Sequence, residues 1–94
     1  MSTFDTDTIR ERLADLDGWE HEDDHITREW TFPDFRSAIG FINRVADLAD
    51  QADHHPDLYN SYTSVRISLT THSEGGVTGR DLDLAARIDE VVDG

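Results

Sequence analysis

Three of the chain's five histidines lie in two short segments that could form one site. His54 and His55 are adjacent in residues 50–56, DQADHHP, and His72 follows an alternating segment and lies 17 residues after His55. The imidazole of histidine titrates near neutral pH without any perturbation, so a cluster of histidines can donate and accept protons. The residue types therefore predict an acid/base site.

Two aspartates precede the adjacent histidines. Asp50 and Asp53 are close enough to bond the second nitrogen of an imidazole, which would fix its tautomer and favour the imidazolium form. The chain contains no cysteine, and no serine lies in a recognisable nucleophile motif. The pattern indicates proton transfer without a covalent intermediate, although the same residues could also be solvated histidines in an acidic loop.

A zinc site is a second interpretation, because histidines and carboxylates bind that ion. The spacing argues against it, since adjacent histidines rarely direct both rings at one ion and no H-x-x-x-H or H-E-x-x-H pair is present. We therefore predict no metal and no cofactor. His21 and His25 flank an acidic turn, where we expect solvated side chains.

Charge restricts the class of protein further. The formal net charge is −13, and all eight basic residues are arginine. Binding to phosphates requires clustered positive charge, so we predict no nucleic-acid partner. An excess of aspartate without lysine favours a protein from concentrated salt, where the Debye length falls to about 3 Å at 1 M. An ordinary acidic protein is the alternative.

Length and hydropathy predict a single domain spanning residues 1–94. A hydrophobic content of 36% supports a folded core. No apolar run is long enough to cross a membrane, and the N-terminus does not resemble a signal peptide. We therefore expect a cytoplasmic protein with no membrane partner.

The first half of the chain contains one segment in which apolar residues have helical spacing and two segments in which they have the spacing of strands. Residues 6–16 have helical spacing, with a possible capping box from Thr8 to Glu11 and a stop at Gly18. Residues 19–22 and 25–32 are expected to be strands joined by an acidic turn. Arg28 interrupts the apolar side of the second strand, which indicates that this end lies near a sheet edge.

The second half repeats this order. Asp34 is a suitable N-cap for a long helix whose apolar stripe is Ala38, Ile39, Ile42, Val45, Ala46 and Ala49, widened by Phe35 and Phe41. This helix ends before Pro56, which places the adjacent histidines on the following turn. Residues 57–62 and 64–70 are expected strands, and Thr78 with Asp81 caps a last helix.

The order is therefore α-β-β-α-β-β-α. It predicts an α+β two-layer sandwich, in which a four-stranded, largely antiparallel sheet carries three helices on one face. Such a sheet has two exposed edges, and pairing them across a two-fold axis would cover them. We expect a homodimer or a homotetramer.

Several spaced motifs agree with one known family. The sequence resembles the pterin-4a-carbinolamine dehydratase family from about residue 33 to residue 92. The resemblance is carried by Asp50-x-x-Asp53-His54-His55-Pro56, then Tyr62, Thr71-His72, Gly76, Thr78 and Arg80-Asp81-x-x-Leu84-Ala85. Phe41 to Val45 of the long helix also fits. The family's α/β sandwich, which forms dimers or tetramers, agrees with the expected fold.

The resemblance implies a dehydratase acting on 4a-hydroxytetrahydropterin, the carbinolamine left after an aromatic amino acid hydroxylase has used its pterin. Loss of water gives the quinonoid dihydropterin, and the family uses no metal or cofactor. By position, His54 and His72 would be the acid/base pair, and His55 would bind and orient the pterin. Asp50 replaces the usual Glu and would support the histidines.

Other matching positions have supporting roles in this resemblance. Asp53 and Pro56 would shape the turn, and Asp81 matches the family although capping alone would explain it. Leu58 stands where the family commonly has Trp, and Ser73 replaces a usual acidic residue. Both departures bear on pterin affinity and on the choice of pterin more than on proton transfer.

Two other functions fit the same sequence. The chain could be a non-catalytic pterin-binding or regulatory dimerisation module, since mammalian members also serve as dimerisation partners of a transcription factor. It could also handle a pterin in molybdopterin metabolism. A pure scaffold would not need the complete histidine set, which favours the dehydratase.

Overall fold

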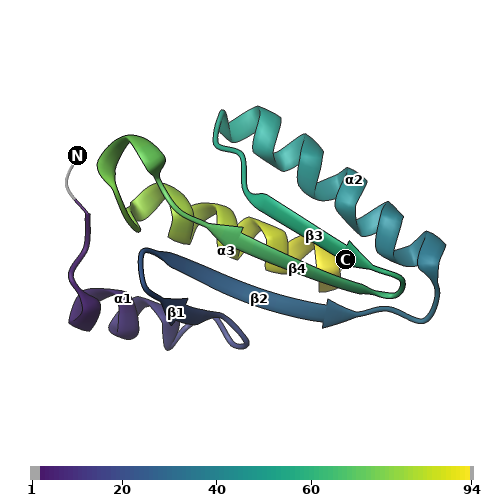
Figure 1. The fold of residues 1–94 in the computed structure, drawn as a ribbon, viewed down its shortest axis with the longest axis horizontal. Coiled ribbons are helices and arrows are strands. Elements are labelled where there is room, and N and C mark those ends of the chain that lie inside the picture. Colours follow the sequence, from purple (N-terminus) through teal and green to yellow (C-terminus); the bar gives the residue numbers. More distant parts are fainter. Residues whose placement is uncertain (1–2, 94) are drawn as a thin grey trace.

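The computed structural model describes residues 3–93 and has the expected order of elements (Figure 1). These are α1 (Thr6–Leu13), β1 (Glu20–Glu22), β2 (His25–Thr31), α2 (Phe35–Ala52), β3 (Asp57–Ser61), β4 (Ser64–Leu69), the 3-10 helix η1 (His72–Glu74) and α3 (Gly79–Asp93). The predicted α+β class with three helices and four strands is confirmed.

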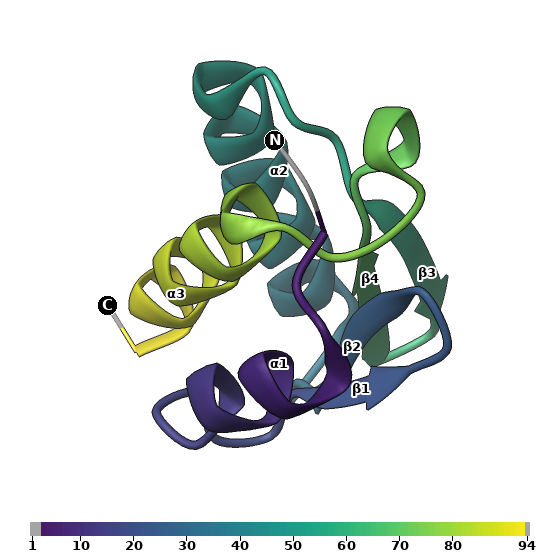
Figure 2. The same cartoon turned by 90° about the vertical axis from the view of Figure 1, so that its left-hand side faces the viewer.

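The four strands form one antiparallel sheet in the order β1-β2-β4-β3. The two hairpins are joined in the centre, where Ile26 of β2 pairs with Leu69 of β4 and Trp30 pairs with Val65. Figure 2 shows the helices on one side of this sheet, with its other face left open. β3 forms one outer edge, so its far side has no strand partner among residues 3–93.

The core lies between the sheet and the helices. Alternate residues of β4, namely Val65, Ile67 and Leu69, are fully buried, as the sequence pattern predicts. The apolar stripe of α2 differs from the predicted one, because Phe41 lies at its centre and Ala46 is exposed. The bulky ring of Phe41 packs against the aromatic side chains of the sheet, which turns this face of the helix inward.

Capping residues set the boundaries of α1 and α2. Asp34 caps α2 by accepting a hydrogen bond from Ser37 N at 2.7 Å, as predicted. The expected cap of α1 was wrong, since Asp5 and not Thr8 is the N-cap and accepts from Thr8 N at 2.8 Å. α1 also ends at Leu13 instead of residue 16, because residues 14–18 form turns that lead into β1.

A partly buried ion pair connects β2 to the last helix. Arg28 Nη1 lies 3.0 Å from Asp89 Oδ1 of α3, and the Trp19 indole donates to the same carboxylate at 3.0 Å. Beyond Thr27, β2 has a strand partner only on the β4 side within residues 3–93, which agrees with the predicted edge. Arg28 is therefore accommodated at the edge of the core by charge pairing.

The segment after β4 leaves the sheet sooner than expected. The strand ends at Leu69, and Thr71 forms a bridge with Gly76 that closes the loop containing η1. His72 opens η1 and is exposed, so it does not continue the polar face of the strand. None of the helices in the described part of the chain is long and apolar enough to cross a membrane.

Candidate active site

The C-terminus of α2 directs the two adjacent histidines to different sides. Asp53 adopts a left-handed conformation, with φ of 49°, and its N–H donates to Asp50 O. His54 N then donates to Ala49 O at 3.1 Å, which completes the pair of bonds typical of a Schellman motif. The reversal of the chain turns His54 inward and leaves His55 exposed.

His54 is held by a carboxylate from a distant element. Its Nε2 lies 2.5 Å from Asp81 Oδ1, 27 residues further along the chain in the first turn of α3. Asp81 is fully buried, and the side chain of His54 is 9% exposed. A buried pair in this geometry fixes the orientation of the imidazole ring.

The second carboxylate oxygen of Asp81 accepts hydrogen bonds from the residue before His72 and from the residue before α3. Asp81 Oδ2 accepts from Thr71 Oγ1 and from Thr78 N, both at 2.9 Å, and the two threonine hydroxyls are 2.8 Å apart. An ionised carboxylate can only accept hydrogen bonds. In the bond between His54 Nε2 and Asp81 Oδ1, the hydrogen is therefore assigned to Nε2. Nδ1 of His54 is then the nitrogen left to exchange a proton.

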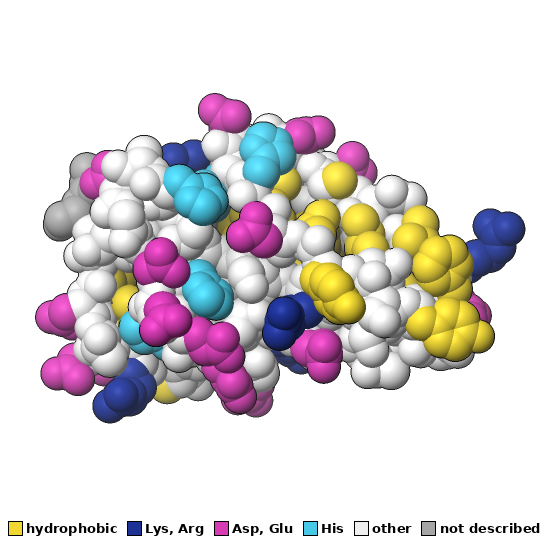
Figure 3. All heavy atoms as spheres, in the orientation of Figure 1, with side chains coloured by type: hydrophobic (Ala, Val, Ile, Leu, Met, Phe, Trp, Pro, Cys, Tyr) yellow, Lys and Arg dark blue, Asp and Glu magenta, His cyan; other side chains and the backbone are white. Residues whose placement is uncertain are grey.

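His55 and His72 are accessible to solvent. His55 Nε2 lies 3.0 Å from Asp50 Oδ1, and both side chains are exposed. His72 follows Thr71 directly, so the hydrogen bond of Thr71 to the buried carboxylate fixes the start of the loop that carries this histidine. Figure 3 shows the visible histidine side chains gathered toward the end of the molecule where α2 ends and β2 begins.

The structure assigns the predicted supporting residues to different tasks. Asp50 approaches His55, whereas Asp53 shapes the turn and its carbonyl accepts from Arg80 Nη2 at 2.7 Å. Pro56 follows the histidines and precedes β3. Asp81 is both the predicted cap of α3 and the partner of His54, and sequence spacing alone revealed only the first of these contacts.

A small cavity opens beside His54. Its volume is about 190 Å³, and neither His55 nor His72 lines it. The lining residues are Ala52, His54, Arg80, Asp83, Leu84 and Arg87. The cavity therefore joins the buried histidine to a charged surface on α3.

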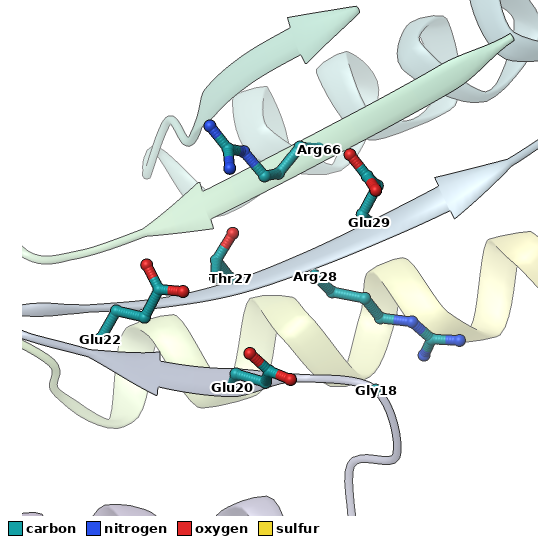
Figure 4. Close-up of a pocket in the computed structure, with 7 residues that line it drawn as sticks. All are labelled: Gly18, Glu20, Glu22, Thr27, Arg28, Glu29 and Arg66. Atoms are coloured by element: carbon teal, nitrogen blue, oxygen red, sulfur yellow. The ribbon is translucent and has the colours of Figure 1, made fainter.

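Another hollow, on the open face of the sheet, contains no histidine (Figure 4). It has a volume of about 350 Å³ and is lined by Gly18, Glu20, Glu22, Thr27, Arg28, Glu29 and Arg66. Figure 4 shows the guanidinium groups of Arg28 and Arg66 directed away from each other. Nothing in this hollow adds to the histidine site.

Metal binding finds no support in the geometry of residues 3–93. Within this part of the chain, no three histidine, aspartate or glutamate side chains are arranged to hold a metal ion. The carboxylate nearest His54 is already used in three hydrogen bonds. The site is built to orient an imidazole.

One known family matches nearly the whole chain. The family model described as Pterin 4 alpha carbinolamine dehydratase matches residues 2–91. The chain belongs to this family.

Relatives across the family are similar over nearly their whole length. A protein of Thermomicrobium roseum, provisionally named pterin-4-alpha-carbinolamine dehydratase, is 44% identical and aligns over 97% of this chain and 98% of its own. One of Halobacterium salinarum with the same provisional name is also 44% identical, over 93% of each chain. The crystal structure of a transcriptional coactivator/pterin dehydratase from Brucella melitensis has a TM-score of 0.92 and 38% identity, covering 96% of this chain and 98% of that one.

Proposed function

We propose that this family member dehydrates 4a-hydroxytetrahydropterin to the quinonoid dihydropterin in tetrahydropterin recycling. The observation that carries the proposal is the buried pair of His54 and Asp81, whose carboxylate also binds the threonine before His72. An imidazole fixed in this way has one nitrogen committed to the protein and one available to a substrate.

The reaction requires two proton movements. As the C4a–O bond breaks, the hydroxyl must gain a proton to leave as water, and N5 must lose its proton as the C4a=N5 double bond forms. His54 and His72 are proposed to supply this acid and this base. General acid–base catalysis contributes about 10²- to 10⁴-fold to rate, which is enough to accelerate a reaction that already proceeds slowly unaided.

His55 is proposed to bind and orient the pterin. Its ring is exposed and is linked to Asp50, so it can turn toward a ligand at little cost. Asp53 and Pro56 would maintain the turn that separates the directions of the two histidines. Because the exchanging groups are imidazoles, the proposed mechanism requires no metal or cofactor.

The test is a spectrophotometric dehydration assay in molar KCl. Wild type should accelerate the reaction above its unaided rate, and His54→Ala and His72→Ala should each abolish most of that acceleration. His25→Ala is the matched control, because His25 lies on β2 beside Asp24 and Glu22. No acceleration by folded wild-type protein, or full activity in both variants, would contradict the proposal.

Self-association is proposed to accompany this function. Phe35, Leu58, Tyr59 and Tyr62 are large apolar or aromatic side chains with 42–78% exposure. Figure 3 shows hydrophobic side chains gathered along α2 and beside the β3–β4 hairpin, where the sheet has a free edge. A second copy of the chain would cover both the apolar surface and the edge, giving a homodimer or homotetramer.

The charge supports a saline cytoplasm as the location. With a net charge of −13, self-repulsion disfavours the folded state in dilute buffer, and molar salt screens it. We expect the melting temperature to rise between dilute buffer and molar KCl in a thermal unfolding measurement. An unchanged melting temperature would contradict this part of the proposal.

A non-catalytic role is the second candidate. It is favoured by the name of the Brucella melitensis structure, which describes that protein as a transcriptional coactivator as well as a pterin dehydratase. A regulatory dimerisation module would use the exposed edge and would not need the buried pair. His72→Ala separates the two, since it should remove turnover and leave partner binding unchanged. The same pocket could also serve molybdopterin metabolism or act beside an aromatic amino acid hydroxylase.

A further inference from the structure

The cavity beside His54 carries an unusual charge for this protein. The whole chain has 21 acidic and 8 basic side chains, yet two of those arginines, Arg80 and Arg87, line this one small cavity. One carboxylate, that of Asp83, lines it as well. The site therefore has a local excess of positive charge on a strongly negative surface.

The two guanidinium groups are held differently. Arg80 donates one N–H to Asp53 O at 2.7 Å, at the end of α2, which anchors it beside the histidine turn. Arg87 forms no ion pair within residues 3–93, although Asp83 is one helical turn before it. Arginine has five donors in a planar fork, so most of the donors at this cavity remain available to a ligand.

The volume restricts what can enter. At about 30 Å³ for each water molecule, a cavity of about 190 Å³ holds roughly six waters. Sites for whole small-molecule ligands are usually about 300 Å³ or larger. The cavity is thus suited to one substituent of a larger ligand whose ring system stays outside.

The chemistry of the substrate indicates which substituent this is. In the pterin ring, N5 is bonded to both C4a and C6, so a group on C6 lies next to the atoms that exchange protons with His54. We propose that the cavity formed by His54, Arg80 and Arg87 is a subsite for an anionic C6 side chain, a carboxylate or a phosphate. The inference rests on the proposed function, and it identifies the substrate class as pterins with an acidic C6 substituent.

Guanidinium groups suit this ligand because they bind carboxylate and phosphate through paired, charge-assisted hydrogen bonds. Such direct contacts persist at short range even where salt screens distant charges. Asp83 opposes the anion from the same cavity wall, so its charge should weaken binding. Removing Arg87 and removing Asp83 should therefore change affinity in opposite directions.

The experiment compares two stable probes, 6-carboxypterin and 6-hydroxymethylpterin, by fluorescence titration near neutral pH in a fixed KCl concentration. Wild type should bind 6-carboxypterin more tightly. Arg87→Gln should weaken binding of the carboxylate about tenfold, the range expected for a lost charge-assisted hydrogen bond, and leave the neutral probe within about twofold. Asp83→Asn should tighten binding of the carboxylate.

Arg10→Gln is the matched control, because it removes the same charge from an exposed position on α1 outside the cavity. Circular dichroism verifies that each variant is folded. Equal affinity of wild type for the two probes would overturn the subsite while leaving the dehydratase intact, as would a preference that survives in Arg87→Gln. Failure of wild type to bind either probe would refute both the subsite and the proposed function.

Discussion

Replacing Asp81 with asparagine tests the buried pair most directly. Asparagine has nearly the same shape as aspartate but carries one oxygen and one amide group. If the oxygen keeps the bonds from Thr71 and Thr78, the amide must face His54 Nε2. Two donors cannot bond each other, so Nε2 must become an acceptor and the ring proton must move to Nδ1. The variant should therefore reverse the tautomer of His54.

The structure bounds the effect on stability. Asp81 is fully buried and accepts from His54, Thr71 and Thr78, so Asp81→Ala leaves buried donors without an acceptor. Breaking a buried pair by removing one partner costs about 3–5 kcal/mol, a large part of the stability of a small domain. Asp81→Asn retains most of the bonds and should cost about 1–2 kcal/mol. For a domain of this size that lowers the melting temperature by roughly 4–16 °C.

The effect on turnover should be larger than the effect on stability. Taking His54 as the base of the proposed pair, a ring whose proton is held on Nδ1 has no lone pair there to accept the N5 proton, so acceleration should fall by about 10²- to 10⁴-fold. The dehydration assay measures this loss, and thermal unfolding shows whether the variant remains folded. Nitrogen-15 NMR of the histidine ring reports the tautomer without any substrate.

Two results would refute this reasoning. The first is a folded Asp81→Asn variant with wild-type turnover, because the carboxylate would then not prepare His54 for proton transfer. The second is an unchanged tautomer together with lost turnover, which would assign Asp81 a different role. Asp50→Asn is the matched control, since it removes an exposed carboxylate beside His55 and should have little effect on stability.

Three further predictions concern the scaffold. Gly18→Ala should lower the free energy of unfolding by more than about 1 kcal/mol, because φ is +90° and the new Cβ would lie 2.7 Å from Arg28 Nε. Gly75→Ala should lower it less, because φ is +77° but the space around the new Cβ is open. Denaturant unfolding measures both free energies. The backbone N–H of Ser37 donates to the Asp34 carboxylate and lowers its pKa below 3.8. The stabilisation of the folded state by the ionised carboxylate is therefore complete above pH 3.8 and disappears as the pH falls through the pKa of the folded state. The melting temperature of Asp34→Asn should accordingly fall less than that of wild type as the pH is lowered. Parallel curves of melting temperature against pH for the two proteins would contradict this. Leu58→Asp, at 42% exposure on the edge strand, should shift the chain toward monomer in light scattering, and an unchanged mass would exclude this edge as the interface.

The sequence by itself determined the local features of this protein. The alternation in β4, the cap at Asp34 and the helix stop before Pro56 depend on neighbours a few residues apart, so their patterns can be recognised in the sequence. The position of the histidines on a turn after α2 follows from the same local rules. The N-cap of α1 was not determined in this way, because Asp5 and Thr8 are both acceptable caps and the choice depends on where the helix packs.

Only the tertiary structure decided which carboxylate holds which histidine. Asp50 and Asp53 are the nearest candidates in sequence, but the left-handed turn at Asp53 directs His54 into the core and away from both. Asp81 reaches His54 because α3 packs beside α2 and brings its first turn to the end of that helix. The same packing sets Arg80 and Arg87 around the cavity. Contacts between residues so far apart depend on how the helices dock, which sequence spacing does not encode.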